Sequence, residues 1–351
     1  MKKREPLIDI AKGISMLFIV FFHCDIWHEF LFQFHVPVFA FLSGYVFNSI
    51  KYCNNGIVGI VQCIKNKLSS LYVPYVGFNI VYILLHNIFL AMNFYIPERG
   101  GIHYSVKELI SKLIQVLSVG FNEGLLTPLW FLPCLMIAVI LYSLIYFCVS
   151  KLTKKNGAMI GITFILSIIG YNTTLPRNIS LAFILMFWFC VGNYCKIYDM
   201  FGFVQKYMEA FRGVILNILI FAGAIGIVLF SMTVREHWSD IEYYIPLGYL
   251  AILSGIVIVM QLSWGAMKIG KILPEIFAII GQHTVVILAL HITIFRIIDA
   301  LQVILYKLSS TSIGLGNMYH NGAWIVLYPI LGVTIPLMLS IGVQRIIEKY
   351  K

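Results

Sequence analysis

Residues 7–47 read LIDIAKGISMLFIVFFHCDIWHEFLFQFHVPVFAFLSGYVF, and this stretch decides how the rest of the chain is interpreted. Its first half is an apolar segment with Lys12 near one end and His23 near the other. The intervening residues make about three helical turns, so both side chains would lie on one helix face, roughly 16 Å apart along the axis. A cation and an imidazole in such a helix are costly inside a bilayer and therefore indicate a functional site.

The composition indicates a polytopic membrane protein. Of the 351 residues, 60% are hydrophobic and 11% are charged, whereas a soluble domain carries about 25% charged residues. The apolar runs are too long for barrel strands, so we expect an all-α bundle of about ten transmembrane helices. The net charge of +10 then reflects topology, not nucleic-acid binding. The seven cysteines have neither paired nor metal-ligating spacing, and we expect no metal site.

The expected spans follow from runs of about 20 apolar residues. They are 7–24, 29–47, 71–94, 127–149, 158–171, 180–195, 213–232, 243–263, 275–297 and 322–343. Two amphipathic surface helices are expected outside them, within 57–72 and 106–119. We expect one integral membrane domain over residues 1–351, with no appended soluble domain and no cleavable signal peptide.

The basic residues predict the topology. Most of them fall on one side of the predicted membrane, at 2–4, 51–67, 151–155, 196–212, 268–271 and 345–351, and fewer fall at 99–112, 177, 235 and 307. This asymmetry places both termini in the cytoplasm of a multi-pass cell-membrane protein. An aromatic belt near the outer interface would be formed by Trp27, Trp130, Trp238 and Trp324.

A second histidine, His35, lies in the next predicted span. It is followed by Pro37, which can break the local helix and free a backbone carbonyl. His23 and His35 would lie on adjacent helices joined by a short loop, where they could share a cavity. Imidazole is the side chain suited to taking and returning a proton near neutral pH. Either histidine could instead form a hydrogen bond within the bundle.

Three lysines could form a positively charged entrance to the site on the cytoplasmic side. Lys12 would lie near Lys65 and Lys67, and lysines bind phosphates as point charges. The alternative is that Lys12 snorkels and pairs with Asp9. Lys65 and Lys67 could simply follow the positive-inside rule.

Other polar and aromatic residues are weaker candidates. His283 and His291 lie on roughly one face of the predicted ninth span, and one of them could line the cavity. Trp130 could form an aromatic wall over that cavity or act as an interfacial anchor. His86 is better interpreted as a buried histidine with its hydrogen bonds satisfied.

Two local patterns have structural interpretations. Arg296 and Asp299 are spaced i,i+3 and are expected to pair with each other. Ser43 lacks the context of an activated nucleophile. A packing notch of small residues at Ser43 and Gly44 is therefore the better interpretation.

These residues together resemble the membrane-bound acyltransferase-3 family, most closely its fucose 4-O-acetylase-like branch. The resemblance covers essentially the whole chain. It depends on Asp9-x-x-Lys12-Gly13 followed by His23, and on the segments FHVPVFAFLSGYVF, KNKLSSLYVPY, PLWFLP and GQHTVVILALH. The family more often has arginine at the position of Lys12, and many members have Arg-x-x-Arg near the third span.

The resemblance implies acetyl transfer from cytoplasmic acetyl-CoA to a hydroxyl of a surface polysaccharide or its undecaprenyl-linked sugar precursor. The family's basic residue–histidine pair maps onto Lys12 and His23. Lys12, with Lys65 or Lys67, would hold the phosphates of acetyl-CoA. His23 would act as general base or take the acetyl group covalently. His35 would orient His23 or protonate the leaving thiolate.

The acceptor sugar is expected to approach from the outer face. It would pass Trp130 and the 95–126 loop, and His283 or His291 would contact it. A transporter or flippase for a polysaccharide intermediate is the alternative, although the chain lacks the repeated halves usual in transporters. A sensor or regulatory domain of the same fold is a third possibility.

Overall fold

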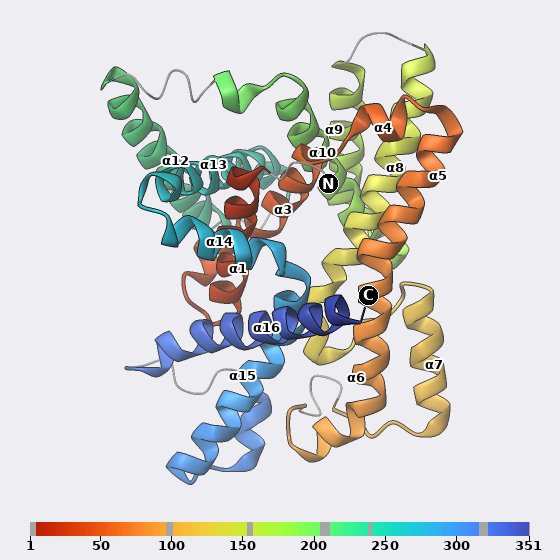
Figure 1. The fold of residues 1–351 in the computed structure, drawn as a ribbon, viewed down its shortest axis with the longest axis vertical. Coiled ribbons are helices and arrows are strands. Elements are labelled where there is room, and N and C mark those ends of the chain that lie inside the picture. The colour runs from red at the N-terminus through yellow and green to blue at the C-terminus, as the bar shows by residue number, and fades with distance from the viewer. Residues whose placement is uncertain are drawn as a thin grey trace. The chain divides into compact units, whose positions relative to one another are not determined.

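The computed structural model describes residues 5–95, 101–152, 157–203, 211–237, 241–315 and 322–350 (Figure 1). Every regular element in these ranges is a helix. The longer elements are α1 (Pro6–His23), α3 (His35–Tyr45), α5 (Gly56–Lys67), α6 (Val73–Ala91), α7 (Val106–Leu117), α8 (Phe131–Leu152), α9 (Gly157–Asn172), α10 (Ile179–Ile197), α12 (Phe211–His237), α13 (Ile241–Lys268), α14 (Ile272–Gln282), α15 (Thr284–Tyr306) and α16 (Trp324–Lys349). The short elements are α2 (His28–Phe32), α4 (Ser49–Cys53), η1 (Leu68–Tyr72), η3 (Gly124–Trp130), η4 (Pro176–Asn178) and η5 (Ser310–Leu315).

The prediction of a polytopic all-α membrane protein is confirmed. Within the described ranges, 8 helical runs are long and apolar enough to cross a membrane. Two shorter apolar helices, α9 and α14, fall in predicted spans as well. A lipid-facing backbone must satisfy its own hydrogen bonds, which is why such apolar runs fold as helices.

The chain divides into two compact units. The first comprises the described residues of Met1–Phe22, Trp27–Asn66 and Ile137–Gln282. The second comprises those of His23–Ile26, Lys67–Met136 and His283–Lys351.

In the first unit, α3 packs directly against α10, and glycines form the contact (Figure 1). A Cβ atom added to Gly44 would collide with the carbonyl oxygen of Phe189, and one added to Gly192 would collide with that of Phe41. Small residues let two helix backbones approach closely in a membrane protein. The predicted packing notch at Gly44 is therefore confirmed.

Glycines also allow α1 and α14 to pack closely within the first unit. A Cβ atom at Gly13 would collide with the carbonyl oxygen of Phe277, and one at Gly281 would collide with that of Asp9. Gln282 also donates a 3.2 Å hydrogen bond from its side-chain amide to the Asp9 carboxylate. The helix that contains Lys12 and His23 is thus fixed by backbone-to-backbone packing near its N-terminal end.

The expected single span over 29–47 is wrong, because the helix is interrupted at Gln33 and Phe34. Pro37 has no N–H group and cannot donate to the carbonyl of Gln33, four residues earlier. The helix resumes as α3 with Pro37 in its first turn, where the missing donor costs little. His35 therefore begins a new helix.

The expected span over 275–297 is also wrong. α14 ends at Gln282, and α15 runs from Thr284 to Tyr306, with His283 at its N-cap. His283 has φ −112° and ψ 18°, which is not helical. His283 and His291 consequently do not share one face of a continuous helix.

The amphipathic helix expected within 57–72 is present as α5, but it does not lie in a separate loop. It continues through η1, a π-helical segment, into α6, giving a run of 36 residues from Gly56 to Ala91. Pro74 lies near the start of α6, and the wider π-helical turn before it accommodates the lost hydrogen bond.

In the second unit, α6 packs against α7 and η3, and α15 packs against α16, η3 and η5. The helix expected within 106–119 is confirmed as α7. Ser105 and Glu108 form a capping box at its start, which satisfies free backbone donors there. Among the residues used in the predictions, 2–4, 99, 154–155, 206, 351 and Trp238 lie outside the described residues.

Candidate functional site

His23 and His291 lie next to each other in the second unit. Their ring centroids are 5.1 Å apart, with an angle of 46° between the ring planes. His23 is the last residue of α1 and is half-buried, and His291 is fully buried in the middle of α15. The contact joins residues far apart in the sequence, so the fold itself assembles the pair.

The protonation of His291 follows from its hydrogen bond. Its Nδ1 lies 2.9 Å from the carbonyl oxygen of Ile287, and a carbonyl can only accept, so Nδ1 carries the proton. In the neutral ring, Nε2 is then a lone-pair acceptor. Nε2 is buried and has no hydrogen-bond partner among the described residues. His291 thus presents one unused proton acceptor in the immediate surroundings of His23.

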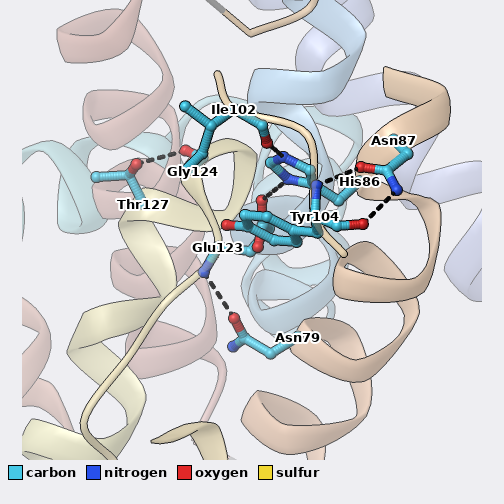
Figure 2. Close-up of polar contacts among 8 residues, drawn as sticks. All are labelled: Asn79, His86, Asn87, Ile102, Tyr104, Glu123, Gly124 and Thr127. Atoms are coloured by element: carbon cyan, nitrogen blue, oxygen red, sulfur yellow. Dashed lines mark hydrogen bonds and ion pairs between the residues drawn. The ribbon is translucent and has the colours of Figure 1, made fainter. Parts of the chain in front are cut away.

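A second buried histidine, His86, has both ring nitrogens occupied (Figure 2). Nε2 donates to the carbonyl oxygen of Ile102 at 2.9 Å, and Nδ1 lies 2.6 Å from Oε1 of Glu123. Both side chains are only 1% exposed. One proton is shared between Nδ1 and the carboxylate, so the pair is neutral overall, as a buried pair must be. The prediction that His86 is buried and satisfied is confirmed, and its nitrogens are not available to a substrate.

Aromatic rings enclose His86 on both faces. Tyr104 stacks on it at 3.5 Å between centroids, and Tyr95 stacks at 4.7 Å (Figure 2 shows Tyr104). Burial, followed by the charge of Glu123, raises the pKa of both phenols. Both tyrosines therefore stay protonated at physiological pH, and their rings keep water away from the histidine–carboxylate pair.

Asparagines on α6 hold the two loop segments that supply these partners. Asn79 accepts a 2.8 Å hydrogen bond from the backbone N–H of Glu123. Asn87 both donates to and accepts from the backbone of Tyr104, at 2.9 and 2.8 Å. The network as a whole ties residues 102–104 and 123 to α6 (Figure 2). Since η3 begins at Gly124, the network also fixes the start of the helix that ends at Trp130.

A hydrogen bond of 2.6 Å between Tyr82 and Thr293 joins α6 to α15. Tyr82 lies one helical turn from His86, and Thr293 lies two residues from His291. We call the residues that hold His86 (Asn79, Asn87, Ile102, Tyr104 and Glu123) the His86 clamp. The clamp and the His23–His291 pair are therefore connected by a side-chain hydrogen bond between two helices of the same unit.

The expected pair of Arg296 and Asp299 is confirmed, at 2.8 Å. Arg296 also donates to the carbonyl oxygen of Ile313 at 3.1 Å. Tyr328 on α16 donates to the other oxygen of Asp299. This cluster neutralises the two charges inside α15 and binds α15 to α16.

His35 lies in the first unit, where its ring stacks on Phe22 at 4.4 Å. Its Nδ1 donates to the carbonyl oxygen of Leu31 at 2.8 Å. The helix interruption before His35 makes this carbonyl accessible to the ring, since the helix does not continue through Gln33. A role for His35 beside His23 stays a prediction.

The lysines and the remaining candidates have defined places in the chain. Lys12 is half-buried in α1, Lys65 is exposed in α5, and Lys67 is the last residue of α5. Trp130 ends η3 and packs edge-on against Phe131. That the three lysines hold phosphates, and that Trp130 contacts a sugar, stay predictions.

His283 shares a 2.8 Å hydrogen bond with Ser340 of α16. Its role as a contact for the acceptor stays a prediction.

Sequence reasoning did not single out Glu123, Asn79 or Gln302. Asn79 and Gln302 lie in apolar helices and are completely buried. A polar residue inside an apolar helix is the signal that could have identified both. Glu123 directly precedes η3, in FNEGLLTPLW, where the local sequence gives no sign that it will be buried.

A family model described as an acyltransferase domain matches residues 6–343. The chain belongs to the acyltransferase-3 family. This acyltransferase therefore carries the histidine pair, the His86 clamp and the lysines within one family domain. No curated protein and no solved structure matches the chain. The narrower likeness to the fucose 4-O-acetylase branch stays a prediction.

Proposed function

We propose that this membrane acyltransferase is an O-acetyltransferase. The donor is acetyl-CoA on the cytoplasmic side of the cell membrane, and both termini lie in the cytoplasm. The acceptor is a hydroxyl of a surface polysaccharide or of its undecaprenyl-linked sugar precursor. The observation that carries the proposal is the position of His23, at the end of the helix that also contains Lys12 and directly beside His291.

In this proposal the acceptor hydroxyl gives its proton to His23 and attacks the thioester carbonyl. The C–O bond forms, the C–S bond breaks, and the proton passes to the leaving thiolate. A covalent acetyl-histidine is the alternative route, in which the imidazole nitrogen attacks first. His291 is held as a neutral acceptor by its bond to Ile287, so it can receive a hydrogen bond from the acceptor or from His23.

The basic residues supply donor binding in this scheme. Lys12, with Lys65 or Lys67, would attract the phosphates of acetyl-CoA. The pantetheine arm is comparable in length to eleven residues of helix, about 16 Å. His35 would orient His23 or relay its proton to the thiolate: Nδ1 donates to Leu31, so Nε2 of the neutral ring is a lone-pair acceptor that can take the proton from His23 before passing it on.

Family membership supports an enzyme over the transporter and sensor that the sequence left open. The test is NMR of surface polysaccharide from cells that carry the wild-type gene, no gene or the His23→Ala variant. We expect O-acetyl signals with the wild type alone. The control is Glu348→Ala, which changes an exposed side chain near the end of α16 and should keep the signals. Full O-acetylation by an inserted His23→Ala protein would refute the assignment of His23.

A further inference from the structure

A cluster of charged and aromatic side chains joins α2 to the C-terminal end of α12 in the first unit. Glu29 accepts hydrogen bonds from Nδ1 of His28 at 3.1 Å and from Nη1 of Arg235 at 3.3 Å. The Arg235 guanidinium lies over the Phe32 ring, with 3.8 Å between its Cζ atom and the ring centroid. We call His28, Glu29, Phe32 and Arg235 the α2–α12 cluster.

The α2–α12 cluster is accessible from outside the protein. The side chains of His28, Glu29 and Arg235 are 39%, 49% and 36% exposed, and Phe32 is 43% exposed. The predicted topology places Arg235 on the outer side of the membrane, from which the acceptor saccharide is expected to approach. A ligand on that side can therefore reach all four side chains.

Buried contacts hold the cluster in place from beneath. Ser231 on α12, one turn before Arg235, donates a 3.1 Å hydrogen bond to the side-chain oxygen of Gln33 at the end of α2. The Phe22 ring stacks on His28 at 4.3 Å and on His35 at 4.4 Å. The cluster is thus fixed before any ligand binds, and a single phenyl ring separates its histidine from His35.

Two observations favour ligand binding over a purely structural role. Trp27, which directly precedes His28, has φ 52° and ψ 34°. This backbone conformation is costly for a bulky residue, and such outliers are found most often at functional sites. The Glu29–Arg235 ion pair is exposed, and an exposed pair contributes little to stability. The packing of α2 on α12 and the Ser231 hydrogen bond already join the two helices.

The chemistry of the cluster matches a sugar. The guanidinium donates hydrogen bonds, the carboxylate accepts them, and the exposed Phe32 ring offers an apolar surface for the C–H groups of a sugar ring. The Glu29 charge offsets the Arg235 charge, whereas a phosphate or sulfate would require donors with an excess of positive charge. A hydroxyl group, which both donates and accepts, fits this mixed set.

We propose that the α2–α12 cluster binds a sugar of the acceptor saccharide, and this inference rests on the proposed function. Arg235 donates to two neighbouring hydroxyls through its planar fork, and Glu29 accepts from a third. Because His35 lies one stacked ring away, a saccharide held here begins beside the residue proposed to relay the proton. The cluster therefore binds and orients the acceptor and takes no part in binding acetyl-CoA.

The test uses oligosaccharides released from the host's surface polysaccharide and de-O-acetylated with mild alkali. Full-length wild type, Arg235→Lys and Glu29→Gln are compared in nanodiscs by thermal unfolding with increasing oligosaccharide, because a ligand that binds the folded state raises the midpoint. Lysine keeps the charge that pairs with Glu29 but lacks the planar fork. We expect each variant to unfold near the wild-type midpoint without ligand and to bind oligosaccharide about three- to tenfold more weakly.

Kinetics give a second readout, which a merely structural ion pair would not move. The KM for oligosaccharide should rise by the same factor in both variants, while the KM for acetyl-CoA stays unchanged. The matched control is Arg177→Lys, because Arg177 is an exposed arginine on the same predicted side of the membrane. It should change neither constant.

Three outcomes would overturn the inference. In the first, Arg235→Lys and Glu29→Gln bind oligosaccharide as the wild type does, which would leave the cluster as a link between helices or a contact for lipid head groups. In the second, oligosaccharides do not stabilise the wild type. In the third, the KM values for both substrates rise together. Failure of the proposed function gives a different result, in which oligosaccharide binding depends on Arg235 but the wild type releases no CoA from acetyl-CoA.

Discussion

The buried pair of His86 and Glu123 gives a sharp prediction about stability. Glu123→Ala removes the carboxylate that shares a proton with Nδ1 of His86 at 2.6 Å, in a site where both side chains are 1% exposed. The bond from the Glu123 backbone to Asn79 does not involve the removed atoms and should persist. The substitution therefore isolates the side-chain pair from the backbone attachment of the loop.

The magnitude follows from burial. Breaking a buried pair by removing one partner costs about 3–5 kcal/mol, because the other polar group is left unpaired. Glu123→Gln should cost only about 1 kcal/mol, since the amide can donate to Nδ1 of a neutral His86 while Nε2 keeps its bond to Ile102. The expected order of stability is wild type, then Gln, then Ala with a much larger loss.

Thermal unfolding of the purified protein can be followed with a thiol-reactive dye. The buried cysteines that would become reactive on unfolding are Cys24, Cys53, Cys63, Cys134 and Cys190. Glu348→Ala is the control, because Glu348 is exposed and an exposed contact contributes at most about 1 kcal/mol. Unfolding of Glu123→Ala at the wild-type midpoint would refute the role of this pair as a clamp. Equal losses for Gln and Ala would show that the carboxylate charge, not the hydrogen bond, is required.

Three further predictions test other parts of the molecule. Gly281→Ala places a Cβ against the carbonyl oxygen of Asp9, so α1 should separate from α14, with a loss of stability of about 1–3 kcal/mol in the same dye assay. Hydrogen bonds from Ser105 lower the pKa of Glu108 from its ordinary value of 4.5. The capping stability is therefore complete above that value and is lost as the pH falls through the lowered pKa, so hydrogen exchange in the first turn of α7 should accelerate there. Glu108→Gln should remove this pH dependence, because the amide does not titrate, whereas Ser105→Ala should only weaken it, because the backbone N–H of residue 105 still donates to Glu108. Lys12→Ala should raise the KM for acetyl-CoA at least about tenfold and change kcat less, as expected for a phosphate contact; an unchanged KM would exclude that contact.

Local patterns were sufficient to predict part of the fold. The extent of α1, the capped helix α7 and the Arg296–Asp299 pair follow from helical periodicity and spacing along one segment. The interruptions were harder to predict. His283 follows an apolar helix whose proline, Pro274, lies in its first turn and cannot end it, and α14 ends where its backbone packs closely on Asp9. Tertiary packing, which no local pattern records, decided that boundary.

In the candidate site, too, some features follow from the local sequence and others only from tertiary packing. The importance of His23 could be inferred because an imidazole in an apolar helix is anomalous by itself. The clamp around His86 depends on Glu123 and Tyr104, which lie on two separate loop segments and meet the histidine only in the folded unit. Partners of this kind are assembled by the fold, so their residues carry no distinguishing local signal.

The central claim is that His23 performs acetyl transfer from acetyl-CoA, and a reconstituted assay tests it most directly. Purified wild type, His23→Ala and Glu348→Ala are each incorporated into vesicles and supplied with radiolabelled acetyl-CoA and de-O-acetylated oligosaccharide. We expect the wild type and Glu348→Ala to release CoA and label the oligosaccharide, whereas a folded His23→Ala protein should do neither. Labelling by His23→Ala at the wild-type rate would contradict the account.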